Sequence, residues 1–185
     1  QWALAIDAAS QTACYREDLI GSYPLNWNAL IGLAKNNRVL WPLKPVHAIS
    51  SFYSIYNNLT EELIPEKKNF INKNYGIKTL TMMKAVSNEL IKDCFTMDPI
   101  QTAELMTETN EFYYCPYIYG FSNYSRKNYR KKILKYIDVM DLSGKGPAGT
   151  HLGGTGIAVS NVSKNKDLAL EYAFWIASAD CQKSI

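Results

Sequence analysis

The sequence lacks most of the short patterns that mark catalytic and metal-binding proteins. Its four cysteines stand at positions 14, 94, 115 and 181, so no two have the spacing of a zinc ribbon or of a redox C-x-x-C pair. The two histidines, His47 and His151, are far apart, and no G-x-S-x-G elbow is present. We therefore expect no metal, no cofactor and no catalytic residue, and we expect a protein that is not an enzyme.

Long apolar runs and a strong net charge are also missing. No run reaches the roughly eighteen apolar residues that a membrane-spanning helix needs. The opening residues, QWALAIDAAS, do not have the pattern of an export signal. A net charge of +3 over 185 residues is too small to indicate a nucleic-acid partner by itself.

Aromatic residues are what the chain has in quantity, with thirteen Tyr and four Trp. Such side chains combine a large apolar face with a polar group, so they serve both cores and ligand clefts. The composition is otherwise that of a soluble globular protein, with 47% hydrophobic and 20% charged residues. The even cysteine count would permit two disulfides, but we expect isolated buried thiols.

Helical and extended patterns alternate along the chain. Apolar periodicity predicts helices over 25–35, 46–58, 79–95, 98–110 and 165–182, with Asn26 and Asp98 as N-caps. Extended segments are predicted at 2–8 as a buried strand, at 111–121 with an interruption at Pro116, at 133–142 and at 154–160. This alternation predicts an α/β fold.

The stretch GPAGTHLGGTGIAVS, residues 146–160, is rich in glycine and raises the question of a phosphate-binding loop. A Walker loop needs G-x-x-x-x-G-K-[ST], which SGKGPAG does not match. A dinucleotide fingerprint opens a helix, whereas these glycines lead into a predicted strand. The other interpretation is a backbone that leads into a strand and that something approaches closely, which only a residue without Cβ tolerates.

Two features allow more than one interpretation. Asp7 is a lone carboxylate in an apolar strand, which either faces a cleft or makes a hydrogen bond at the strand end. The segment SRKNYRKKILK places Arg126, Lys127, Arg130, Lys131, Lys132 and Lys135 beside Tyr124 and Tyr129. This pattern suits a nucleic-acid groove, but a solvated helix face accounts for it as well, and we favour the second.

Several stretches, taken in order, resemble the family 1 extracellular solute-binding proteins, the carbohydrate receptors of ABC importers. The segment ALAIDAASQTACYREDL, followed by PLNW, is similar to the crossing into the second lobe and the helix after it. MDPIQTAELMTETNEFYYCPYIYGFSNYSR resembles a helix and a strand that carry site aromatics. GPAGTHLGGTGIAVSNVSKNKDLALEYAFWIAS resembles the return strand and helix.

The resemblance implies a periplasmic-binding-protein-like fold and a ligand cleft. It assigns to that cleft Asp7, Gln11, Pro45, His47, Phe52, Tyr117, Tyr119, Asn123, Gly153, Gly154 and Thr155. Phe52 and Tyr117 have an alternative as core residues, and either histidine has one as a structural residue. The implied partners are a small carbohydrate and the membrane permease of an ABC importer, with no nucleic acid, and the implied location is outside the cytoplasmic membrane.

Family members are about twice as long as this chain. We therefore expect a fragment or a truncated member, with residues 1–137 as the second lobe and 138–185 as a hinge return with part of the first lobe. The surface that the missing lobe would cover predicts self-association. The implied function is capture of a carbohydrate by hinge closure, without catalysis. The alternative is a truncated relative that binds a partner or nucleic acid through residues 126–135.

Overall fold

The structure, a computed structural model, describes residues 3–60, 70–146 and 149–184. Two compact units are present: a larger unit, Gln11–His151, and a smaller unit that combines Gln1–Ser10 with Leu152–Ile185. The chain passes between them at residues 10 and 11 and again at 151 and 152. Residues 138–151 therefore belong to the larger unit, while the division into lobes at residue 137 stays a prediction.

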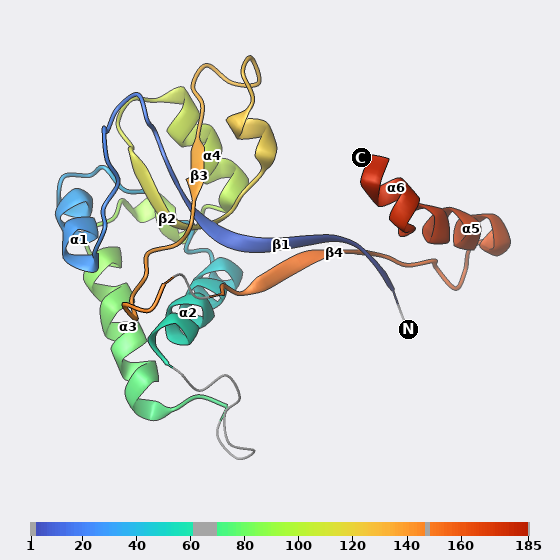
Figure 1. Ribbon diagram of the computed structural model, residues 1–185, viewed down its shortest axis with the longest axis horizontal. Helices are drawn as coiled ribbons and strands as arrows, with labels where there is room; N and C mark the ends of the chain where they lie inside the picture. The colour runs from blue at the N-terminus through green and yellow to red at the C-terminus, as the bar shows by residue number, and fades with distance from the viewer. Residues whose placement is uncertain (1–2, 61–69, 147–148, 185) are drawn as a thin grey trace. The chain divides into compact units, whose positions relative to one another are not determined.

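The larger unit is built on an antiparallel sheet with the second half of β1 at its centre (Figure 1). Strand β1 (Leu4–Tyr15) pairs with β2 (Tyr114–Tyr119) on one side and with β3 (Lys135–Ile137) on the other. Val39 adds an isolated parallel bridge to Tyr114. The α/β prediction is confirmed, with an open sheet covered by helices.

The interruption predicted at Pro116 takes the form of a register shift: β2 runs through this residue, but its pairing with β1 is irregular there. Thr12 pairs with Ile118 and Cys14 with Cys115, so two steps along β1 match three along β2. The extra residue is a bulge, which leaves one position outside the ladder. A proline lacks the N–H that a regular position would donate, so a bulge accommodates it.

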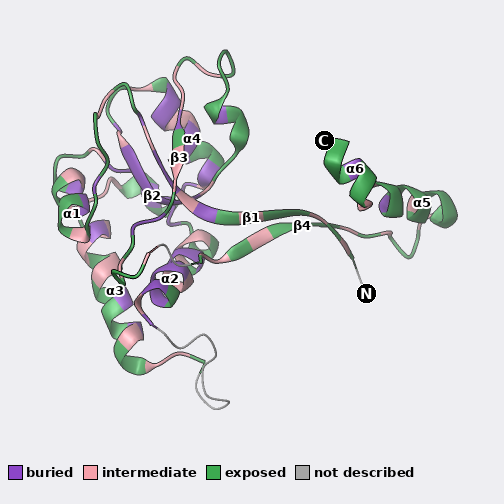
Figure 2. Ribbon diagram, in the orientation of Figure 1, coloured by how far each residue is buried: buried purple, intermediate pink, exposed green. Residues whose placement is uncertain are grey.

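Three helices cover one face of this sheet: α1 (Trp27–Lys35), α2 (Pro45–Leu59) and α3 (Lys73–Ser87). Their buried side chains join Trp41, Tyr114 and Tyr117 in one apolar cluster. The opposite face packs on α4 (Pro99–Glu108) and on the 3-10 helices η1 (Lys92–Phe95) and η2 (Ser122–Ser125). Figure 2 shows this burial in the strands and on the inner sides of the helices.

Both predicted helix caps are confirmed. The Asn26 side chain accepts a hydrogen bond from the Ala29 N–H at 3.0 Å. Asp98 forms a capping box with Gln101, with contacts of 2.9 and 3.0 Å. A side-chain oxygen at this position satisfies an N–H that the first helical turn leaves unpaired.

The helix predicted over 79–95 has different limits in the structure. Asn72 caps α3 before Lys73, and the helix ends at Ser87. Ser87 and Asn88 have short polar side chains that compete with the helical backbone, which favours an end there. The apolar periodicity continued past this point because Leu90 packs against both apolar clusters, and Ile91 and η1 pack in the cluster that contains α4.

The smaller unit contains Leu4–Ser10 of β1, which pairs with β4 (Leu152–Ile157), and the helices α5 (Lys166–Ile176) and α6 (Ala179–Ser184). The helix predicted over 165–182 is thus two helices. The strand predicted as buried over 2–8 is exposed or half-buried at residues 3–8, and Trp2 lies outside the described residues. Within the described part of the chain, no helix combines the length and apolarity needed to cross a bilayer.

Exposed apolar side chains are concentrated in α5. Leu168, Tyr172 and Trp175, which have the spacing of one helix face, are 66%, 52% and 58% exposed. Ala173 is the buried residue of this helix. Figure 2 shows α5 and α6 as mostly exposed, in contrast to the helices of the larger unit.

Candidate functional site

One polar constellation in the larger unit joins the end of β2 to the last residue of that unit. The Tyr119 hydroxyl lies 2.8 Å from Nδ1 of His151 and donates to the main-chain oxygen of the same residue at 3.1 Å. The His151 N–H donates to the Ser54 hydroxyl of α2 at 2.9 Å. Two segments far apart in the sequence thereby fix one imidazole.

A buried hydrogen-bond network contacts the Tyr119–His151 pair through Ser54. Gln11 donates through Nε2 to the Ser51 hydroxyl at 3.1 Å and accepts from the Ser54 hydroxyl at 2.6 Å. Trp41 donates its indole N–H to Ser51, and the Thr150 hydroxyl donates to the Gln11 main-chain oxygen. Because buried polar groups are costly when unpaired, this network holds β1, α2 and the segment before β4 in one arrangement.

Aromatic faces surround the His151 ring. Tyr53 stacks on it with a centroid distance of 5.7 Å and an interplanar angle of 20°. The His47 ring lies 6.5 Å from that of Tyr119. Phe52 packs edge-on against Tyr53 at 5.6 Å. We call His47, Tyr53, Tyr119 and His151 the His–Tyr cluster; all four side chains are half-buried and so remain partly accessible.

Two predicted site residues carry buried polar atoms without a hydrogen-bond partner. These atoms are Nδ1 of His47 and the hydroxyl of Tyr117. Burial lowers the pKa of His47, with Asp98 opposing this shift and Lys44 adding to it. His47 is therefore biased toward the neutral form. Burial raises the pKa of Tyr117, so its hydroxyl keeps its proton, while its ring stacks on Trp41 at 5.8 Å.

The remaining predicted residues of the larger unit lie at varied positions. Gln11 is 2% exposed, and its side-chain amide is bonded within the protein. Pro45 is the exposed first residue of α2, and Asn123 is exposed in η2. Phe52 is half-buried and stacks on Tyr56. The structure thus brings together His47 and Tyr119, and it pairs Gln11 with Tyr119 in the β1–β2 ladder.

The other predicted residues lie together in the smaller unit. Asp7 pairs with Thr155, Ala8 with Gly154 and Ala9 with Gly153. Asp7 and Thr155 are exposed. Gly154 has φ +152°, and a Cβ there would lie 2.5 Å from the Asp7 main-chain oxygen. The close approach that the glycines predicted is made, at Gly154, by the neighbouring strand.

Sequence reasoning undervalued His151 and did not select Tyr53 or Ser54. A partial signal was present, because His47, Ser51 and Ser54 are spaced by four and three residues and therefore share a face of α2. Small hydroxyl residues inside an apolar helix need partners, which predicts that this face meets polar groups. Nothing in the local sequence places Tyr119 beside His151, since that contact depends on the tertiary fold.

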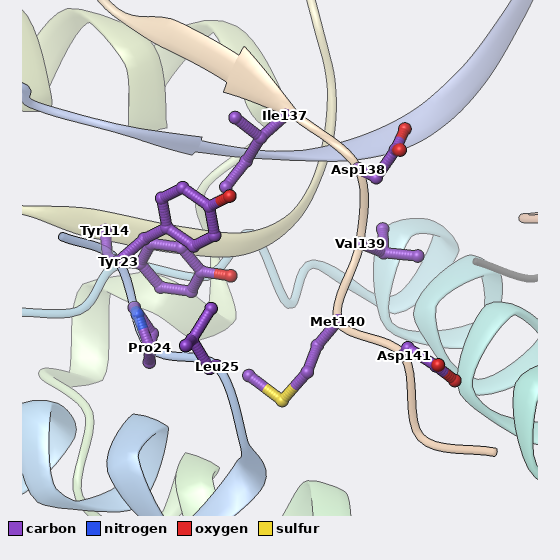
Figure 3. Close-up of a pocket in the computed structure, with 9 residues that line it drawn as sticks. All are labelled: Tyr23, Pro24, Leu25, Tyr114, Ile137, Asp138, Val139, Met140 and Asp141. Atoms are coloured by element: carbon purple, nitrogen blue, oxygen red, sulfur yellow. The ribbon is translucent and has the colours of Figure 1, made fainter. Parts of the chain in front are cut away.

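A separate cavity of about 550 Å³ lies elsewhere in the larger unit (Figure 3). Tyr23, Pro24, Leu25 and Tyr114 form one side, and Ile137 to Asp141 form the other. In Figure 3 the two tyrosine hydroxyls point toward the segment that carries Val139 and Met140. None of the predicted site residues lines this cavity.

The described residues offer no group of three His, Cys, Asp or Glu side chains placed to hold a metal ion. All four cysteines are free, buried thiols. Burial raises the pKa of Cys94 and of Cys115, which keeps both thiols protonated. The His–Tyr cluster offers hydrogen bonding by imidazoles and phenols and stacking by ring faces.

No family model matches the sequence, and no curated protein matches it. Solved structures do match. An ABC transporter solute-binding protein from Agrobacterium radiobacter, in complex with ribitol, is 17% identical, with a TM-score of 0.72 over 99% of this chain and 50% of its own. The maltose–maltodextrin-binding protein of Alicyclobacillus acidocaldarius is 13% identical, with a TM-score of 0.65 over 98% of this chain and 50% of its own.

A spermidine/putrescine ABC transporter substrate-binding protein from Streptococcus pneumoniae is also similar, at 12% identity and a TM-score of 0.65. The match covers 99% of this chain and 50% of that protein. The chain thus spans about half the length of the structures it matches. Its fold is the α/β fold of the periplasmic-binding-protein-like solute-binding proteins.

Proposed function

We propose that this chain acts as a solute-binding receptor, alone or as part of a longer polypeptide, and that it captures a carbohydrate without catalysis. The observation that carries the proposal is the fold, which matches such proteins over 98–99% of the chain in the structures compared above. Two of the compared proteins are described with ribitol or with maltose and maltodextrin. The His–Tyr cluster combines the imidazole of His47, which burial biases toward its neutral form, with phenols and ring faces. This combination supports a neutral polyhydroxyl ligand, because sugars are held by stacking and by a few directed hydrogen bonds.

Capture would proceed by hinge closure, with delivery to the membrane permease of an ABC importer outside the cytoplasmic membrane. The division into two units supports a hinge, since the chain crosses between them at two points, after Ser10 and after His151. On this proposal the larger unit is the second lobe. The ligand would meet the accessible members of the predicted set, with His151 and Tyr53 added: Asp7, Pro45, His47, Phe52, Tyr119, Asn123, Gly153, Gly154 and Thr155. The buried members, Gln11 and Tyr117, would support the site from the core.

Self-association is part of the proposal for the smaller unit. Leu168, Tyr172, Phe174 and Trp175 are exposed on one short helix, α5. A soluble protein rarely leaves so many large apolar side chains uncovered on neighbouring turns. A second copy of the chain would cover them, and sedimentation at rising concentration measures whether it does.

The alternative, a nucleic-acid-binding segment over residues 126–135, has weaker support. Arg130 forms a salt bridge with Glu104 at 2.6 Å, and its guanidinium lies 4.4 Å from the centre of the Tyr129 ring. Lys132 pairs with Asp18 at 3.2 Å and Lys135 with Glu17 at 3.6 Å. These intramolecular partners neutralise part of the charge that a phosphate backbone would otherwise attract.

Isothermal titration calorimetry with ribitol, maltose and spermidine tests the proposal, at low and at high salt. We expect one of the two neutral ligands to bind with an affinity that salt leaves nearly unchanged. The Tyr53→Leu variant removes the ring stacked on His151 and should weaken binding by about 1 kcal/mol. Tyr129→Leu, on the far basic segment, is the matched control and should leave binding unchanged.

Two results would contradict this function. Binding of spermidine alone, with steep salt dependence, would show an electrostatic site in place of a carbohydrate site. Equal losses in the two tyrosine variants would show that binding does not involve the His–Tyr cluster.

A further inference from the structure

We propose that Tyr119 fixes His151 in its Nδ1–H tautomer, so that the ring presents Nε2 to the ligand as an uncharged acceptor for a hydroxyl proton. The ligand in this inference rests on the proposed function. The arrangement of protons does not, and it can be measured on the protein alone.

Contacts with three residues restrain His151. Its N–H donates to Ser54, its main-chain oxygen accepts from Tyr119, and its ring stacks on Tyr53. Nδ1 contacts the Tyr119 hydroxyl at 2.8 Å. These contacts restrain both the backbone and the ring plane, so the direction in which Nε2 points is restrained as well.

Counting protons selects one tautomer. A phenol has one proton to donate, and Tyr119 faces two acceptor candidates on His151, namely Nδ1 and the main-chain oxygen. If the phenol donates to Nδ1, the contact with the main-chain oxygen receives no proton of its own. If Nδ1 carries a proton and donates it to the phenol oxygen, the phenol proton is free for the main-chain oxygen. The second arrangement makes both hydrogen bonds, and it leaves Nε2 without a proton.

Nε2 of His151 makes no hydrogen bond to the described residues, and the side chain is half-buried. A bare imidazole nitrogen accepts a hydrogen bond and cannot donate one. A ligand hydroxyl can supply the proton, whereas a carboxylate or an ether oxygen would meet a second acceptor. The pair therefore selects for a hydrogen-bond donor at this point of the ligand, and in a neutral polyol that donor is a hydroxyl.

The two residues have different roles in this arrangement. His151 contacts the ligand, and Tyr119 is a positioning residue that sets the tautomer of His151. The network of Gln11, Ser51 and Ser54 serves as the support, since Ser54 accepts from His151 while it donates to Gln11. The outer partner of an imidazole commonly decides which ring nitrogen carries the proton.

Long-range ¹H–¹⁵N NMR spectra of the ¹⁵N-histidine-labelled chain test the tautomer, because a protonated ring nitrogen and a bare one resonate far apart. We expect His151 to be protonated at Nδ1 and bare at Nε2 at neutral pH. Tyr119→Phe removes the phenol oxygen, so the Nε2–H form should become populated. Tyr136→Phe is the matched control on β3, where the hydroxyl bonds to Phe121, and it should leave the His151 signals unchanged.

Addition of ribitol or maltose, with binding followed by calorimetry, tests the ligand contact. We expect the Nε2 resonance to shift while the nitrogen stays without a proton. His151→Leu should weaken binding by about two- to tenfold, the range of one neutral hydrogen bond. His151→Gln, whose amide oxygen can still accept, should lose less.

Each outcome separates the parts of the inference. A His151 that is protonated at Nε2 in the free protein overturns it, as does sugar binding that leaves the Nε2 resonance unmoved. If the tautomer is as expected and neither sugar binds, the proposed function fails, and with it the role of Nε2 toward a sugar, while the action of Tyr119 on the tautomer is upheld.

Discussion

Replacing Arg16 by lysine should cost the larger unit much of its stability, although the charge is kept. The Arg16 side chain is fully buried. Its guanidinium makes five hydrogen bonds: two to the Asp18 carboxylate, one each to the main-chain oxygens of Met106 and Thr109, and one to the Asn110 side chain. Met106 lies in α4 and Thr109 is its C-cap, so Arg16 satisfies oxygens that the helix end leaves unpaired.

The magnitude follows from the number of acceptors that lysine abandons. An ammonium has three donors on one point, against five in a planar fork, so at least two acceptors lose their partner. An acceptor left unpaired costs about 1–3 kcal/mol when it is buried and less when it is exposed, as Asp18 is, so we take the low end for two acceptors and expect a loss of about 2 kcal/mol in the free energy of unfolding. In a chain of this size that corresponds to a fall in Tm of about 4–8 °C.

Urea denaturation of the wild type, Arg16→Lys and Arg126→Lys measures the effect. Arg126 is exposed, so the same substitution there should change stability by less than about 0.5 kcal/mol. An Arg16→Lys protein as stable as Arg126→Lys would refute the reasoning. It would show that the buried fork and the end of α4 are not coupled.

Three further predictions follow from local contacts. The hydrogen bond from Arg16 lowers the pKa of Asp18 from 3.8 to about 2, so the stability that the Asp18 carboxylate contributes is present above pH 3.8 and is lost as the pH falls toward 2. Because Asp18 is 43% exposed, we expect this contribution to be about 1 kcal/mol. Unfolding measured from neutral to acid pH should show this pH-dependent loss in the wild type and not in Asp18→Asn. Gly154→Ala should raise hydrogen exchange in Leu4–Ser10 and Leu152–Ile157, since its Cβ would meet the Asp7 oxygen, whereas Gly21→Ala, with open space around it, should not; equal exchange in both variants would contradict this. The four buried cysteines should react with a thiol reagent only after unfolding, and fast reaction of the native chain would show that one of them is accessible.

The sequence predicted the helices best where the chemistry of their ends was local. Asn26 and Asp98 cap their helices through atoms only three residues away, so the pattern of side chains is sufficient. The end of the 79–95 helix could not be predicted in this way, because Leu90 and Ile91 continue the apolar pattern while packing from outside a helix. Periodicity reports burial, and burial persists beyond Ser87 although the helix does not.

Periodicity alone did not decide exposure. Leu168, Tyr172 and Trp175 have the spacing of one helix face, and all three are exposed. A hydrophobic spacing predicts that a face can be covered, and it contains no information on what covers it. The same limit applies to residues 3–8, where an apolar strand lies in a two-stranded pairing with β4.

The candidate site was accessible from the sequence only in part. Tyr119 and His47 were selected through the resemblance, and the structure places their rings near each other. His151 was visible as a residue type, but its role depends on contacts with Ser54, Tyr53 and Tyr119, which are 97, 98 and 32 residues away in the chain. Contacts at that separation are set by the sheet register and by α2, and no local pattern encodes them.

The fold alone cannot decide between a sugar and a charged solute, because the matched structures include a protein described with ribitol and one named for spermidine and putrescine. The side chains carry that decision. A polyamine needs carboxylates to offset its charge, and in the described part of the chain no carboxylate hydrogen-bonds to His151, Tyr119 or the Gln11 network. Burial biases His47 toward its neutral form, and the proton arrangement inferred for Tyr119 leaves His151 a neutral acceptor. The His–Tyr cluster itself offers imidazoles, phenols and ring faces, and Asp7 is the one carboxylate in the predicted set of ligand residues. The choice between ribitol or maltose and spermidine therefore tests whether the cluster or that carboxylate decides the ligand, which concerns the chemistry of the site and not only its shape.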